Sequence, residues 1–147
     1  MKAAFITIED SEGIVKNNVE VSKTQIIIED FRKLCSLARH SKFADAEALL
    51  SQPDWSVPID YQDDTGNTLL HIACQNGSKR LVKLFLRRGA SLGIQNLNGQ
   101  TCLHFAFRYG YAELGDYLIS KGADNSVTNK DGLTCYEGLG ARELLLL

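Results

Sequence analysis

Histidine and cysteine side chains lie close together at two places in the sequence. His71 precedes Cys74 by three residues, and Cys102 precedes His104 by two. Imidazole nitrogen and thiolate sulfur are the ligands that zinc prefers in tetrahedral protein sites. A zinc site is therefore one hypothesis for these four residues, and it must be weighed against the elements that position them.

No motif typical of catalysis occurs in the chain. No serine, cysteine or lysine lies in a recognisable nucleophile motif, and no glycine-rich phosphate loop follows a candidate strand. The acidic pairs at residues 9–10, 29–30 and 63–64 fall in a leader, a candidate helix and a turn, where solvated charge is normal. We therefore predict that the protein is not an enzyme and takes no cofactor, no metal and no small-molecule substrate.

One unit of 33 residues is written twice between Asp63 and Thr128. The two copies match at Gly66 and Gly99, Thr68 and Thr101, Leu70 and Leu103, His71 and His104, Ala73 and Ala106, Gly77 and Gly110, and Gly89 and Gly122. A third copy begins at the expected spacing, since Gly132 and Thr134 lie 33 residues after Gly99 and Thr101. A fixed period of this length is typical of a solenoid, in which each unit buries its apolar face against a neighbour.

Each unit reads as a turn followed by two helices. Gly66 and Gly99 lie in turn sequences and supply a positive φ, and the threonine two residues later can cap a helix. The first helices are predicted over residues 69–76 and 102–109, each followed by a glycine suited to a helix C-terminus. A second helix, which in the first copy carries the apolar residues 81, 82 and 84–86, then runs to the next glycine.

The stretch from Gly66 to Ala73 reads G-N-T-L-L-H-I-A and resembles the G-x-T-P-L-H-x-A motif of the ankyrin repeat family. Residues 99–106 repeat the motif, and residues 81–90 and 114–123 resemble the family's second helix. Both copies lack the motif proline, which is helpful but dispensable at the first helical turn. With its degenerate ends the resemblance covers about 115 of 147 residues. It implies an all-α solenoid of stacked helix-turn-helix units with hairpin-like turns, roughly four repeats in number.

The expected organisation follows this period. It comprises a leader at 1–23, a degenerate N-capping repeat at 24–62, full repeats at 63–95 and 96–128, and a partial C-terminal repeat at 129–147. In the leader, residues 5–8 and 19–21 alternate well enough for short strands, and a partly ordered segment is the other interpretation. Capping-box spacing at residues 22–25 predicts a helix to about His40, followed by a second helix over residues 43–50.

Two apolar features fall outside the repeat pattern. Trp55, in a loop stiffened by two prolines, either covers the end of the first helix pair or anchors a partner. The chain ends in four leucines at residues 144–147, which either dock as a capping helix or mark a chain cut from a longer protein.

The resemblance gives the histidines and cysteines a structural role. In the family the histidine bonds to backbone and ties neighbouring turns together, so His71 and His104 are expected to be structural, as are Gly66, Gly99, Thr68 and Thr101, and no metal is expected. Cys102 and Cys135 lie one period apart and should stack about 8–10 Å from each other, too far for a disulfide. All four cysteines, at positions 35, 74, 102 and 135, are expected to be small core residues in a reducing compartment.

Length and charge limit the possible partners. The 147 residues suit one domain, and the net charge of −2 without a basic stripe argues against nucleic acid. No run of about 18 apolar residues predicts a membrane span, and no signal peptide is recognisable. We expect a monomer in the cytoplasm, with the nucleus left open as the other compartment.

The predicted function is to bind a partner protein. The family grips partners with turn tips and first helices, which form a concave surface. By position, the partner-binding residues are Asp64, Thr65, Asn67, Gln75, Asn76, Leu97, Asn98, Gln100, Arg108, Tyr109, Lys130, Asp131 and Leu133. Leu97, Arg108, Tyr109 and Leu133 are the strongest candidates, since tyrosine and arginine are typical interface anchors. Three versions of this function remain open: a free-standing adaptor or inhibitor, an N-terminal targeting domain of a longer chain whose activity, enzymatic or otherwise, lies downstream, or a structural part of an assembly.

Two differences between the repeats suggest a packing pair. Gly115 occupies a helix interior, at a cost of about 1 kcal/mol relative to alanine, where the preceding repeat has Val82. Phe107 stands where that repeat has the smaller Cys74. We predict that the phenyl ring fills the space that the missing side chain leaves.

Overall fold

Six helices and no strand make up the part of the chain that the structure describes. The computed structural model describes residues 11–137. The helices are α1 (Ser11–Arg39), α2 (Phe43–Leu50), α3 (Leu69–Gln75), α4 (Lys79–Arg87), α5 (Cys102–Arg108) and α6 (Ala112–Ser120). The all-α repeat fold predicted from the sequence is confirmed.

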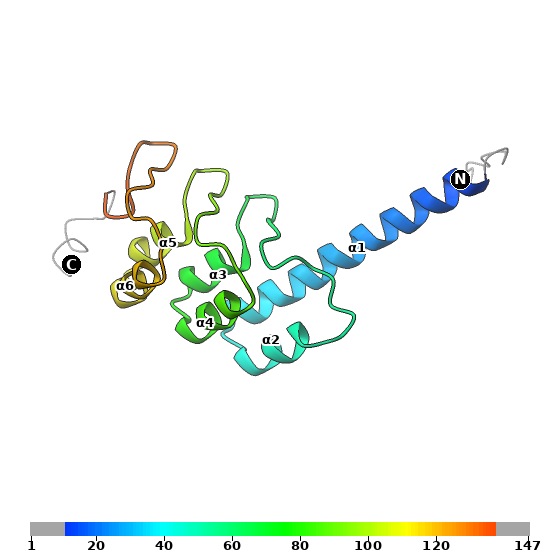
Figure 1. Cartoon of the computed structure of the whole chain (residues 1–147), viewed down its shortest axis with the longest axis horizontal. Coiled ribbons are helices and arrows are strands. Elements are labelled where there is room, and N and C mark those ends of the chain that lie inside the picture. The colour runs from blue at the N-terminus through cyan, green and yellow to red at the C-terminus, as the bar shows by residue number, and fades with distance from the viewer. Residues whose placement is uncertain (1–10, 138–147) are drawn as a thin grey trace.

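Successive helices pair, and the pairs stack along one direction (Figure 1). Helix α1 packs on α2, α3 on α4, and α5 on α6, while α3 lies between α1 and α5. A long turn follows each pair, and the three turns project side by side, away from the layer of α2, α4 and α6. The first helices and the turns therefore present one side of the stack, and the second helices present another.

The core lies between the two helical layers. Its fully buried side chains come from every pair and include Leu34, Ala38, Ala46, Leu70, Leu81, Phe85, Leu103 and Leu118. Each leucine removed from water in this way stabilises the fold by roughly 1.5–3 kcal/mol. All four cysteines are buried and unbridged, and burial raises the pKa of the Cys35 thiol to about 12 and that of Cys135 to about 11. These thiols stay protonated at neutral pH and pack as small apolar side chains.

The helices of the two full repeats lie close to the predicted positions. The first helices end one residue earlier than expected, at Gln75 and Arg108. Gly77 and Gly89 follow helix ends with φ of 65° and 87°, the left-handed conformation that favours glycine. The predicted second helix of the capping repeat, residues 43–50, coincides with α2.

The predicted strand at residues 19–21 is wrong, because these residues lie within α1. The helix starts at Ser11, so the capping-box spacing at residues 22–25 does not mark a helix start. Alternation of Val19, Glu20 and Val21 suits a strand, but no glycine or proline between residues 14 and 39 interrupts a helix. Once the helical hydrogen-bond ladder is established from residue 24 onward, nothing in this segment stops it from extending toward the N-terminus. Figure 1 shows this half of α1 extending beyond the stack.

Trp55 is partly buried and packs against the core. Its indole Nε1 donates to the carbonyl oxygen of Val57 at 3.0 Å. This arrangement favours the covering role over the exposed anchor. The other predicted strand, residues 5–8, and the leucine-rich end at residues 144–147 lie outside the described residues.

Phe107 packs directly over Gly115. A Cβ atom on Gly115 would lie 2.5 Å from Cζ of the Phe107 ring, well inside van der Waals contact. The ring also contacts Tyr136, with ring centroids 4.9 Å apart, and is 3% exposed. The aromatic ring therefore occupies the space of the absent side chain, as the sequence comparison of the two repeats predicts.

Candidate functional site

The projecting turns and the ends of α3 and α5 carry the residues that the sequence predicts for partner binding. We call this surface the turn-tip face. Eight of its residues are exposed, namely Asp64, Thr65, Leu97, Asn98, Arg108, Tyr109, Lys130 and Asp131, and five are partly buried, namely Asn67, Gln75, Asn76, Gln100 and Leu133. The hydrogen bonds described below connect these residues from one unit to the next.

Each turn is closed by one side chain at its first residue. In the middle turn, the Asn96 Oδ1 atom accepts from the backbone N–H groups of Asn98 and Gln100 at 2.9 and 3.0 Å. Asp63 and Asn129 make the same pair of bonds one unit earlier and one unit later. The three turns therefore share one conformation that is fixed within each turn.

Backbone hydrogen bonds also join each turn to the next. The N–H of Leu97 donates to the Thr65 carbonyl at 3.0 Å, and the N–H of Lys130 donates to the Asn98 carbonyl at 3.0 Å. Gly99 allows this approach, because its φ is 72° and a Cβ there would lie 2.8 Å from the Lys130 nitrogen. The turn tips are consequently held in register by the backbone.

A histidine crosslinks adjacent units at the base of each full turn. The Nδ1 atom of His71 accepts from the Thr68 N–H at 3.1 Å, and Nε2 lies 2.9 Å from the Gln100 carbonyl oxygen. His104 repeats the arrangement with its own capping threonine, Thr101, and with the Leu133 carbonyl at 3.2 Å. Since Nδ1 is an acceptor, the proton lies on Nε2, which donates to the neighbouring turn.

This arrangement requires a neutral imidazole. Burial lowers the pKa of His71, and burial likewise lowers the pKa of His104. Both ring nitrogens are already engaged with protein atoms, so neither ring has a free lone pair for a metal. Residues 11–137 contain no cluster of three or more potential metal ligands.

Three exposed side chains stand out on the face. Leu97 is 60% exposed at the tip of the middle turn, and Tyr109 is 46% exposed at the end of α5. The Tyr109 ring meets the Phe105 ring edge-on with centroids 5.9 Å apart, and its hydroxyl accepts from Gln75 Nε2 at 3.2 Å. Arg108, the neighbour of Tyr109, is exposed at the last residue of α5. Tyr109 is thus both accessible and held in place.

Arg108 also lines a hollow of about 220 Å³ between the middle and last turns. The other lining residues are Gln100, His104, Asn129, Asp131, Leu133, Cys135 and Glu137. The Glu137 carboxylate accepts from the Thr134 N–H at 2.7 Å, which is the bond that histidine makes to the capping threonine in the two full repeats. This bond lowers the pKa of Glu137 and favours its carboxylate form. The hollow therefore combines the Arg108 guanidinium with the carboxylates of Asp131 and Glu137.

Some predicted binding residues are engaged within the protein. The Asn67 Oδ1 atom accepts from Asn96 Nδ2 at 2.9 Å, and Asn76 Nδ2 donates to the Ala38 carbonyl at 3.4 Å. These amides are less available to a partner than the tip residues. Their side chains connect neighbouring units.

Sequence reasoning missed a glutamine at the base of the turns. Gln62 Nε2 donates to the Gly66 carbonyl at 2.7 Å and to the Gln95 carbonyl of the next unit at 3.2 Å. Gln95 makes the equivalent bonds to Gly99 and Thr128. The sequence contains a pattern that could have predicted this contact. Gln62 and Gln95 are 33 residues apart, in register with the other positions that match between the two repeats.

The comparisons with known proteins agree with this architecture. A family model described as ankyrin repeats, in three copies, matches residues 34–129. Two curated relatives, both named ankyrin repeat and SAM domain-containing protein 6, from Mus musculus and Rattus norvegicus, are 45% identical over 40 residues. The aligned segment is 27% of this chain and 4% of each relative, so the chain spans a small fraction of their length. Within the described residues, no helix combines the length and apolarity that crossing a bilayer requires.

Proposed function

Because the chain belongs to the ankyrin repeat family, we propose that it is a non-catalytic module that holds a partner protein on its turn-tip face. Ankyrin repeats are generally protein-interaction modules. The exposure of Leu97 carries the proposal for this surface. Because Leu97 is 60% exposed, much of its apolar surface lies in water and not against its own fold. The backbone beneath it is fixed by hydrogen bonds on both sides.

Preorganisation supports the same surface. Ordering side chains and loops on binding costs conformational entropy and so weakens the net binding free energy. A surface that is already ordered in the free protein loses less conformational entropy when a partner binds. Tyr109 is supported by Phe105 and Gln75, and the turns are joined to one another. Tyrosine and arginine are enriched among residues that dominate binding energy, and Arg108 lies beside Tyr109.

The proposed mode of action is recognition without chemistry. The histidine rings are engaged as structural crosslinks, and the thiols are buried. Four buried free thiols suit a reducing compartment, so we place the protein in the cytoplasm, with the nucleus as the alternative. We propose that it acts as a monomer.

A second candidate is that the chain is the targeting domain of a longer protein. The segment that aligns with this chain is 4% of the length of the curated relatives, and their printed name includes both an ankyrin repeat and a SAM domain. In this version the turn-tip face still binds the partner. The activity that the binding directs would then reside elsewhere in the longer chain.

A capture experiment tests the proposal. The wild-type chain and a Leu97→Ala, Arg108→Ala, Tyr109→Ala variant are immobilised and exposed to the same lysate. We expect the wild type to retain a partner that the variant loses by at least about tenfold, as expected for removing interface anchors.

The matched control replaces comparable side chains elsewhere: Ile26→Ala, Lys33→Ala and Tyr111→Ala, all exposed positions off the turn-tip face. All three proteins must melt at similar temperatures. Equal retention by both variants would contradict the assignment of the site to the turn-tip face.

A further inference from the structure

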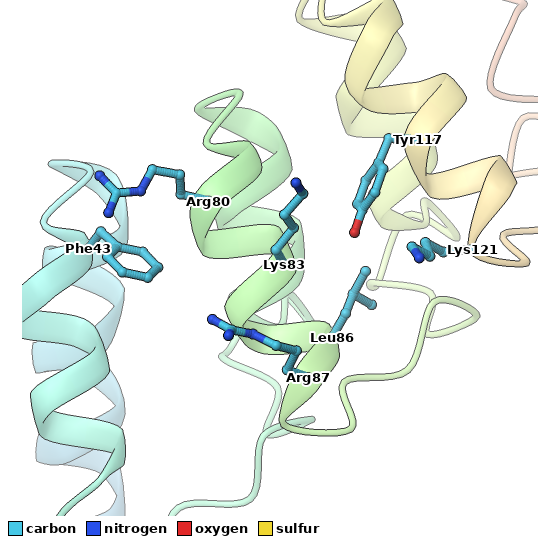
Figure 2. A pocket seen from close by; sticks show the side chains of 7 residues that line it. All are labelled: Phe43, Arg80, Lys83, Leu86, Arg87, Tyr117 and Lys121. Carbon is cyan, nitrogen blue, oxygen red and sulfur yellow. The ribbon is translucent and has the colours of Figure 1, made fainter.

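A second surface with different chemistry lies on the layer of second helices. A groove of about 540 Å³ runs across α2, α4 and α6 (Figure 2). It is lined by Phe43 of α2, by Arg80, Lys83, Leu86 and Arg87 of α4, and by Tyr117 and Lys121 of α6. We call this surface the second-helix groove, and the turn-tip face contributes no residue to it.

The second-helix groove is strongly basic, although the chain as a whole has a net charge of −2. Four of its seven lining side chains are cationic and none is acidic. Glu47 lies 3.9 Å from Arg87, but these side chains are 46% and 65% exposed, where an ion pair contributes little. Glu113 and Asp116, one period after Arg80 and Lys83, do not line the groove.

Aromatic rings contact three of the four groove cations, Arg80, Lys83 and Lys121, and also contact Lys79, which does not line the groove. The Lys79, Lys83 and Lys121 ammonium groups lie 5.0, 5.6 and 5.5 Å from the centroid of the Tyr117 ring. The Arg80 guanidinium lies 4.2 Å from the Phe43 centroid. Each such cation–π contact is worth roughly 0.5–1 kcal/mol at an exposed site.

Three ammonium groups around one ring repel one another. Because all three lie within 5.6 Å of the same centroid, no two can be farther apart than twice that distance. An anionic ligand entering among them would offset this repulsion, which salt partly screens at exposed positions, and would be attracted to each charge. The positions of these cations do not stabilise helix α4 itself. Lys79 and Arg80 lie in its first turn, where the helix dipole disfavours positive charge.

The floor of the groove is apolar. Phe43, Leu86 and Tyr117 are all partly buried and pack against the core. In Figure 2 the side chains of Lys83 and Leu86 project from α4 into the space between α4 and Tyr117 of α6. A ligand that fits both features carries negative charges that flank at least one apolar side chain.

We propose that the second-helix groove binds an acidic segment of a partner protein, rich in glutamate or aspartate and carrying an aromatic or aliphatic side chain that enters between Leu86 and Tyr117. Nucleic acid fits less well, because a long polyanion would also meet the rest of a surface whose net charge is negative. A bilayer fits less well, because its flat surface does not fill a hollow between three helices. A short acidic segment contacts only the cationic groove and not the rest of the surface.

The test uses a fluorescein-labelled peptide of glutamates with one phenylalanine and one leucine, measured by fluorescence anisotropy with the full chain. We expect saturable binding that weakens as salt rises and that is absent for a peptide with lysine in place of glutamate. Replacing the phenylalanine of the peptide by serine should weaken binding severalfold. In the protein, Lys83→Glu with Lys121→Glu should weaken binding at least about tenfold, since both charges are reversed.

The matched control is Lys23→Glu with Lys33→Glu, which makes the same charge change at exposed positions of α1 outside the groove. It should alter peptide affinity less than about twofold after salt correction. Equal losses in both double variants would show non-specific electrostatic attraction and overturn the proposal. The absence of peptide binding would overturn it too, as would binding of phosphatidylserine vesicles or a single-stranded oligonucleotide in its place.

The turn-tip variant with alanine at positions 97, 108 and 109 separates this proposal from the previous one. It should bind the acidic peptide as the wild type does, because no altered residue lines the groove. Loss of peptide binding in that variant would contradict the assignment of the acidic segment to the second-helix groove. It would not count against the proposal that a partner binds the turn-tip face.

Discussion

At the scale of single residues, the histidines act as neutral crosslinks between units. Each imidazole accepts a bond from its own capping threonine and donates to the carbonyl of the next turn. Protonation of Nδ1 would replace an acceptor by a donor facing an N–H group. The fold therefore depends on the uncharged form of His71 and His104.

This dependence predicts that stability falls as the pH is lowered. Burial places the folded pKa of His71 and His104 below the unfolded value of about 6.5, so at a pH well above that value both states are neutral and the bonds contribute fully. Below that pH the unfolded chain binds protons first, and each histidine lowers the free energy of unfolding by at most about 1.4 kcal/mol for each pH unit. Denaturant titrations from about pH 8 to about pH 5 should show this decline.

The single variant His104→Gln provides the control for the pH series. It should be less stable than the wild type at neutral pH, and its stability should decline less steeply on acidification. A decline of the same steepness in both proteins would assign the pH dependence to groups other than this histidine.

The Phe107–Gly115 pair makes a second prediction at this scale. Alanine at position 115 would gain about 1 kcal/mol in helix propensity, but its Cβ would overlap the Phe107 ring, which Tyr136 restrains. Overpacking costs about 1–3 kcal/mol, so after the propensity gain of about 1 kcal/mol we expect Gly115→Ala to lower the free energy of unfolding by up to about 2 kcal/mol. Adding Phe107→Leu should recover part of the loss. A higher melting temperature for Gly115→Ala alone would contradict the packing account.

At the scale of elements, the repeat period predicted most of what the structure shows. Residues that recur every 33 positions, such as Gly66 and Gly99, located the turns and the first helices of the two full repeats within about a residue, and the second helices within about three residues. The start of α1 was misplaced, because a local capping pattern at residues 22–25 looked like a helix start inside a segment that is helical throughout. Local signals indicate where a helix can begin, and only neighbouring sequence and packing decide whether it does.

The two surfaces differed in how far the sequence could predict them. The turn-tip face was predictable by position, because its residues occupy equivalent slots in successive units. The second-helix groove was not, because Phe43, Lys83 and Tyr117 occupy three different slots of three units. Only the stacking of α2, α4 and α6 brings these side chains to one hollow.

At the scale of the whole molecule, the solenoid presents two surfaces with complementary properties. The turn-tip face combines rigid turns with exposed Leu97 and Tyr109, and the second-helix groove combines cations with an apolar floor. A stack of three helix pairs has few long-range contacts outside nearest neighbours, so each surface is built by adjacent units. One partner with an acidic extension, or two separate partners, would suit this arrangement.

Site-directed photocrosslinking reports whether the partner lies on the turn-tip face. Benzoylphenylalanine is placed at position 97 in one chain and, as the matched control, at the exposed position 26 of α1 in another. Each chain is bound to the captured partner and irradiated. We predict a covalent adduct with the partner from position 97 and none from position 26. An adduct from position 26 alone, or none from position 97 in a complex that demonstrably forms, would contradict the account.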